Sequence, residues 1–132
     1  MRRFLILGAI MALSACADMS PPPLATTAPA TPVFFQPYSV ALDKPALDAI
    51  AAAAVTAAER PEARIIVLGA ADAGGNTQAN IRLSKTRARI VADQLIADGV
   101  GPGRIRARGL GEQSAPEASA QSARRVVIRI EG

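Results

Sequence analysis

Residues 68–88 read LGAADAGGNTQANIRLSKTRA, and this stretch predicts how the chain folds. It continues an apolar run, Ile-Ile-Val-Leu at residues 65–68, that is typical of a buried strand. Asp72 follows this run and precedes Gly-Gly-Asn at residues 74–76, a sequence that favours a turn. Helical spacing of apolar residues then continues to Leu95. We therefore expect a strand, an acidic side chain at its end, a glycine turn and a long helix.

Three polar residues lie close to one line on this helix, because successive helical residues turn by about 100°. They are Asn80, Ser84 and Arg87, and Val91 and Leu95 continue the line. The buried stripe of the helix is thus predicted to be polar where the helix begins and apolar where it ends. Polar groups on a buried stripe need hydrogen-bonding or charged partners.

Asp72 is the expected neighbour of Arg87, since it lies at the end of the strand that precedes the helix. An acid and a base beside a glycine turn suit a ligand that carries both an ammonium and a carboxylate. The alternative is an ion pair with a purely structural role, and the spacing of the residues favours this simpler interpretation.

The composition excludes several kinds of catalytic and metal site. The 132 residues suffice for one domain, and they include no histidine and one cysteine. Ser-His-Asp and Cys-His catalysis, histidine-ligated metals, thiolate clusters and an internal disulfide are therefore ruled out. We expect no catalytic residue, no metal and no cofactor.

Residues 1–15 are predicted to be a secretory signal peptide, with Arg2 and Arg3 before a short apolar segment. The sequence Leu-Ser-Ala-Cys at residues 13–16 resembles a bacterial lipobox, which implies acylation of Cys16 as the mature N-terminus. The alternative is an ordinary signal peptide followed by an incidental cysteine. In lipoproteins of enteric type, an Asp directly after the cysteine would retain the protein in the inner membrane. Ala17 at this position therefore implies the outer membrane.

Residues 16–32 are predicted to be the lipidated N-terminus and a proline-rich tether. Five prolines with Ala, Thr and Ser favour an extended chain that packs no core. At about 3.1 Å per residue, the tether reaches roughly 50 Å.

The formal charge is +4, and from Arg82 onward ten basic residues face five acidic ones. A basic surface can bind nucleic acid, but an exported chain meets little of it. The remaining alternatives are contact with an anionic cell-wall polymer and an ordinary solvated surface.

The folded domain is predicted over residues 33–132. We expect strands at 33–36, 64–69, 104–108 and 125–130, and helices from the N-cap Asp43 to about residue 60 and at 77–98, with Gly99 after the second helix. The sequence does not decide whether residues 113–123 contain a short helical turn. The order is β-α-β-α-β-β, an α+β two-layer sandwich. Right-handed connections would place both helices on one face of a mixed sheet.

The chain resembles the OmpA-like peptidoglycan-binding domain over about residues 33–131. The resemblance rests on an ordered set of matches: Gly69, Asp72, Gly75, Asn80, Leu83, Ser84, Arg87, Ala88, Gly99, Val100, Arg104, Ile105, Gly109, Gly111, Glu112, Pro116, Arg124, Arg125 and Val126. It implies that Asp72 holds the ammonium of diaminopimelate in a wall stem peptide and that Arg87 holds its carboxylate. Arg124 is a further expected contact, and Asn80 either binds ligand or caps the turn.

The sequence departs from the family pattern at the usual His-Thr pair, here Ala70 and Ala71, at the usual aromatic residue, here Ala79, and at the usual Asn, here Ala123. The first hypothesis is therefore a non-enzymatic outer-membrane lipoprotein, with its domain in the periplasm, that grips peptidoglycan without a covalent bond. The alternative is a domain that has lost wall binding and docks envelope proteins. An enzymatic interpretation lacks an activated nucleophile or paired acids. No nucleic-acid partner is expected.

Overall fold

The computed structural model describes residues 30–113 and 123–132. The predicted signal peptide, Cys16 and residues 17–29 of the tether lie outside the described residues, as does most of the undecided segment. The α+β class and the element order are confirmed. The elements are β1 (Ala30–Phe34), α1 (Lys44–Ala58), β2 (Arg64–Asp72), α2 (Thr77–Ala97), a 3₁₀ turn (Pro102–Arg104), β3 (Ile105–Gln113) and β4 (Arg125–Glu131).

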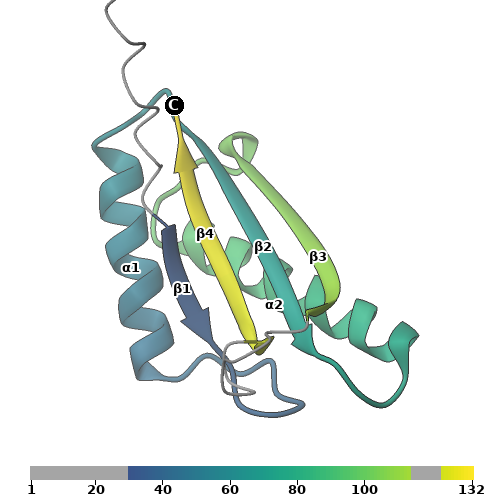
Figure 1. The fold of residues 1–132 in the computed structure, drawn as a ribbon. Helices are drawn as coiled ribbons and strands as arrows, with labels where there is room; N and C mark the ends of the chain where they lie inside the picture. The colour runs from purple at the N-terminus through teal and green to yellow at the C-terminus, as the bar shows by residue number, and fades with distance from the viewer. Residues whose placement is uncertain (1–29, 114–122) are drawn as a thin grey trace, which may run out of the picture.

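The four strands form one mixed sheet in the order β1-β4-β2-β3. β2 runs parallel to β3 and antiparallel to β4, and β4 runs antiparallel to β1. Both helices cover the same face of the sheet, as predicted, and no described helix covers the other face (Figure 1). No helix in the described part of the chain is both long enough and apolar enough to span a membrane.

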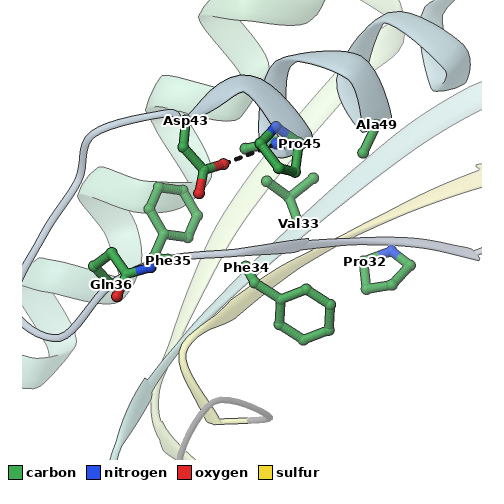
Figure 2. A pocket seen from close by; sticks show the side chains of 9 residues that line it. Pro32, Val33, Phe34, Phe35, Gln36, Asp43, Pro45 and Ala49 are labelled. Atoms are coloured by element: carbon green, nitrogen blue, oxygen red, sulfur yellow. Dashed lines mark hydrogen bonds between the residues drawn. The ribbon is translucent and has the colours of Figure 1, made fainter.

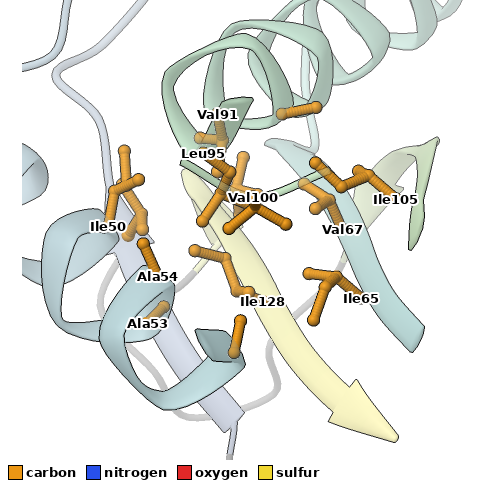
Figure 3. Close-up of a cluster of buried hydrophobic side chains, with 14 of the residues drawn as sticks. Ile50, Ala53, Ala54, Ile65, Val67, Val91, Leu95, Val100, Ile105 and Ile128 are labelled. Carbon is orange, nitrogen blue, oxygen red and sulfur yellow. The ribbon is translucent and has the colours of Figure 1, made fainter. Parts of the chain in front are cut away.

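The core lies between the helices and the covered face of the sheet (Figure 3). Ile50 of α1, Val91 and Leu95 of α2, and Val67 and Ile128 of the sheet are fully buried there. The buried side of α1 is otherwise made of alanines, whose small side chains let the helix lie close to the strands. The predicted apolar stripe of α2 is confirmed, because Ala88, Val91, Ala92 and Leu95 are all buried.

Both helices begin after a capping side chain, and α2 is followed by the expected glycine, whereas α1 ends at Ala58, two residues before the predicted end. The side chain of Asp43 accepts a hydrogen bond of 2.9 Å from the backbone N–H of Ala46 and so caps α1. Asn76 caps α2 in the same way through the N–H of Ala79, at 3.0 Å. Gly99 follows α2 with φ of 103°, a left-handed conformation that glycine adopts readily.

The first strand differs from the prediction. β1 begins at Ala30 and ends at Phe34, so the last three residues of the predicted tether belong to the sheet. Pro32 lies opposite Val127 of β4 and still fits, because β1 is an edge strand and a proline there loses no bond on its unpaired side.

Gly69 of β2 lies where α2 comes closest to the sheet. A Cβ at this position would lie 2.1 Å from the backbone oxygen of Ser84, so helix and strand could not keep their present separation. We expect Gly69→Ala to lower the free energy of unfolding by about 2–3 kcal/mol, because the clash is with backbone. Urea unfolding measures the change. Gly103→Ala is the control, since a Cβ there meets nothing within 4 Å, and equal losses in both variants would contradict the close packing.

Candidate functional site

Arg87 is fully buried at the polar end of the α2 stripe. Its guanidinium donates from Nε to the carbonyl of Ser39 at 3.0 Å, from Nη1 to Ala70 at 3.2 Å and from Nη2 to Gln36 at 3.1 Å. It also lies 5.1 Å from the centre of the Phe35 ring. Arg87 therefore fastens the connection between β1 and α1 to the end of β2.

The charges around Arg87 act in opposite directions. Burial lowers the pKa of Arg87 below its ordinary value, the carboxylate of Asp72 raises it, and the positive charge of Arg124 lowers it further. Asp72 and Arg124 are thus close enough to Arg87 for their charges to be felt. The cluster of these three residues contains two cations and one anion, so it carries one excess positive charge.

The direct partner of Asp72 is Arg124, not Arg87 as expected. Nη1 of Arg124 lies 3.1 Å from Oδ2 of Asp72, and Nε of Arg124 donates to the carbonyl of Phe35 at 3.3 Å. Arg87 makes no hydrogen bond to Asp72 within the described residues, because its own bonds go to backbone carbonyls. Asp72 and Arg87 are close enough for their charges to interact, as predicted, but the ion pair of Asp72 is with Arg124.

The other two polar residues of the stripe have internal partners. Nδ2 of Asn80 donates to the carbonyl of Gly74 at 2.7 Å and to Oε1 of Glu112 at 2.8 Å, so Asn80 fixes the glycine turn. The hydroxyl of Ser84 accepts a bond of 2.9 Å from the N–H of Gly111, which ties α2 to β3. Asn80 therefore supports the turn in the described structure.

A small cavity of about 150 Å³ lies beside Asp72. Its lining includes the glycine turn, Asn80, Leu83 and Tyr38, a residue that the sequence did not single out. Tyr38 is 93% exposed and has φ of 54°, a conformation that costs a non-glycine residue energy. The carbonyls of Gln36 and Ser39, on either side of Tyr38, are those that Arg87 holds. No sequence signal marks a left-handed tyrosine.

A second cavity, of about 190 Å³, lies between β1 and the start of α1 (Figure 2). Val33, Phe35, Pro45 and the carboxylate of Asp43 line it. That carboxylate is engaged as the cap of α1, which leaves the cavity without a convergent set of ligand-binding groups. The cavity at Asp72 is the better candidate site.

The departures from the family pattern fall on different parts of the site. Ala70 and Ala71 are buried at the end of β2, and the carbonyl of Ala70 accepts from Arg87. Ala79 is exposed in the first turn of α2. Ala123 is buried directly before Arg124.

Comparison with known proteins places the chain in a family. The profile of the OmpA family matches residues 34–129. The probable lipoprotein YiaD of Escherichia coli (strain K12) is 36% identical over 104 residues, which are 74% of this chain and 47% of that protein. Outer membrane protein A of Serratia marcescens is 45% identical over 51 residues, 39% of this chain and 14% of that protein. The chain thus spans less than half the length of these two relatives.

A solved structure gives the same fold. The peptidoglycan-associated lipoprotein from Burkholderia pseudomallei superposes with a TM-score of 0.69 at 24% identity, over 76% of this chain and 90% of that chain. The profile match covers most of the described sheet and both helices, including the cluster of Asp72, Arg87 and Arg124. This chain therefore belongs to the OmpA family.

Proposed function

We propose that this chain is a peptidoglycan-binding protein of the bacterial envelope, attached to the outer membrane through Cys16 with its domain in the periplasm. Membership of the OmpA family supports the proposal, as does the similarity to proteins named as a probable lipoprotein and a peptidoglycan-associated lipoprotein. The observation that carries it is the cluster of Asp72, Arg87 and Arg124, in which Asp72 lines the small cavity.

The cluster suits a group that carries both charges, such as the end of a diaminopimelate side chain. Arg124 contacts Oδ2 of Asp72, and Oδ1 makes no hydrogen bond within the described residues, so it is open to a ligand ammonium. The bonds of Arg87 to described residues use three of its five N–H groups. A ligand carboxylate would neutralise the excess positive charge through charge-assisted hydrogen bonds to the arginines.

A sedimentation assay with purified diaminopimelate-containing sacculi tests this function. We expect the wild-type chain to sediment with the sacculi and Asp72→Asn to remain largely in solution. Asp48→Asn is the matched control, because Asp48 is an exposed carboxylate that pairs with Lys44 on the outside of α1. If the wild type stays in solution, or both variants sediment equally, the proposed function is wrong.

The alternative function is docking of envelope proteins, and the alanines at positions 70, 71 and 79 favour it. Those residues leave the site with fewer side-chain contacts than the family pattern provides. This alternative would be supported if the wild-type chain did not sediment with sacculi but was captured by one envelope protein.

Lipidation of Cys16 is tested separately by intact-mass analysis of the membrane-extracted protein. We expect the mass of a chain that begins at Cys16 and carries acyl groups. Cleavage at another residue without an acyl mass would contradict the anchor.

Substitution of Tyr38 by glycine should change stability and ligand binding in opposite directions. Tyr38→Gly should raise the free energy of unfolding by about 0.5–1 kcal/mol, because glycine adopts φ of 54° without strain and the exposed ring buries little. The same change should weaken binding of a stem peptide, since it removes one wall of the cavity. Tyr38→Ala keeps the strain and should gain no stability. Thermal unfolding and peptide titration measure the two effects, and a less stable Tyr38→Gly would contradict the strain.

A further inference from the structure

Five arginines lie on the face of the sheet that the helices leave uncovered. We call this surface the open face; its charged residues are Arg64, Arg106, Arg108, Arg125, Arg129 and Glu131. Strand register places them together, because Ile66 of β2 lies opposite Arg129 on one side and Arg106 on the other. Leu68 and Arg108 are likewise partners, and Arg125 lies opposite Phe34. All five arginines are exposed.

The open face holds the entire net charge of the described chain. Elsewhere in residues 30–113 and 123–132, eight basic and eight acidic residues cancel. On the open face, five arginines meet one glutamate, which leaves a net charge of +4. None of these arginines takes part in a salt bridge between described residues, since those bridges are Lys44–Asp48 and Asp72–Arg124.

Apolar side chains lie between the arginines. Ile66 and Leu68 are partly exposed and, with Arg106 and Arg108, line a groove of about 410 Å³. Phe34 is 40% exposed, and Figure 2 shows it on the opposite side of β1 from Val33, which points toward α1. Arginine side chains with apolar stems beside aliphatic groups suit the boundary between water and lipid.

The position of β1 indicates which anionic surface this face meets. Ala30, where the described chain begins, lies directly opposite Arg129 at the edge of the open face. Only residues 17–29 separate it from Cys16, and thirteen residues span at most about 45 Å when fully extended. An acylated Cys16 would therefore hold this face within reach of its own membrane at a high effective concentration.

We propose that the open face docks onto anionic lipid headgroups of the membrane that carries the anchor. The inference rests on the proposed lipidation of Cys16, but it concerns a different surface from the cavity at Asp72, and of its arginines only Arg125 is next to a residue of that site, Arg124. Asp72 lies six residues beyond Ile66 along β2, about 20 Å from the end where the tether leaves. Docking would fix the orientation of the domain while the site lies at the far end of the sheet.

Binding of the non-acylated chain to vesicles tests the proposal. A chain of residues 17–132 keeps every described element, and thermal unfolding checks that it folds. Vesicles of phosphatidylethanolamine with anionic phosphatidylglycerol are compared with neutral phosphatidylcholine vesicles by co-sedimentation. We expect binding to the anionic vesicles alone, with loss of binding when salt is raised from about 0.05 M to about 0.5 M.

Two triple variants with the same change in net charge locate the binding surface. Changing Arg106, Arg108 and Arg129 to Gln should weaken binding to anionic vesicles about 100-fold, since each arginine near such a surface contributes about fivefold. The matched control changes Arg82, Lys85 and Arg89, which are exposed on α2, and should stay within about threefold of the wild type. If the first triple variant fails to fold, Arg108→Gln alone should show a loss of about fivefold.

Equal weakening by both triple variants, equal binding to neutral vesicles, or no binding at low salt would overturn the proposal. Sacculus binding separates it from the proposed wall function. The triple variant of the open face should sediment with sacculi as the wild type does, whereas Asp72→Asn should bind vesicles normally. Loss of sacculus binding in the triple variant would instead assign the open face to the wall.

Discussion

Replacing Arg87 with alanine should lower the free energy of unfolding by about 3–5 kcal/mol. The change removes the donors for three backbone carbonyls, at Gln36, Ser39 and Ala70, and leaves a cavity beside the Phe35 ring. A domain of this size has a total stability of only about 5–15 kcal/mol. The midpoint of thermal unfolding should therefore fall by more than about 10 °C.

Arg89→Ala provides the matched control, because Arg89 is exposed on the same helix and should lose no more than about 0.5 kcal/mol. Arg87→Lys should be intermediate, since one ammonium keeps the charge but cannot reach carbonyls on three separate positions. Urea and thermal unfolding followed by circular dichroism measure all three variants. If Arg87→Ala were as stable as Arg89→Ala, the bonds to the connection between β1 and α1 would contribute nothing.

This result would change how binding data for Arg87 are interpreted. A family resemblance alone suggests that loss of wall binding in Arg87→Ala reports a lost ligand contact. The structure indicates that the same substitution should also free the segment that contains Tyr38, because Arg87 holds the carbonyls of Gln36 and Ser39, and Tyr38 lines the cavity. The two effects can be separated only by changing the ligand while Arg87 stays in place.

The helix period accounts for what the sequence predicted about this site. Residues at helical spacing share a face whatever surrounds them, so Asn80, Ser84 and Arg87 were expected together on a buried stripe, and all three are buried there. The strand predicted before the turn likewise indicated that Asp72 would lie near these three residues. These inferences depend on local geometry within 21 residues of sequence, which is where sequence patterns are most informative.

The remaining features depend on long-range pairing or on strain. Arg124 reaches Asp72 from 52 residues away, and the contact follows from the place of β4 beside β2, which no local pattern specifies. Pro32 was predicted to be the last residue of the tether, yet it belongs to β1, because an edge strand accepts a proline. The sequence shows an excess of basic residues, but not that five arginines share one face of the sheet, because they come from three strands and gather only through strand register.

Changing the ligand should reveal the second large effect, on binding of the stem peptide. The wild-type chain should bind a diaminopimelate muropeptide about 10–100-fold more tightly than the matching lysine muropeptide, which lacks the second carboxylate. Both peptides keep the terminal ammonium. The preference therefore reports contact of the arginines with the carboxylate, without any substitution at Arg87.

Asp72→Asn should weaken binding of both muropeptides, by about 2–4 kcal/mol, because both offer the same ammonium to the lost carboxylate. Its unfolding free energy should change far less than that of Arg87→Ala, since the side chain of Asp72 is 38% exposed. Calorimetric titration of the wild type, Asp72→Asn and Asp48→Asn with the two peptides gives all the affinities needed. Equal affinity of the wild type for both peptides would show that the arginines do not contact the second carboxylate of the ligand. Unchanged binding by Asp72→Asn would show that Asp72 does not contact the ligand either. Both results together would favour the alternative function, docking of an envelope protein.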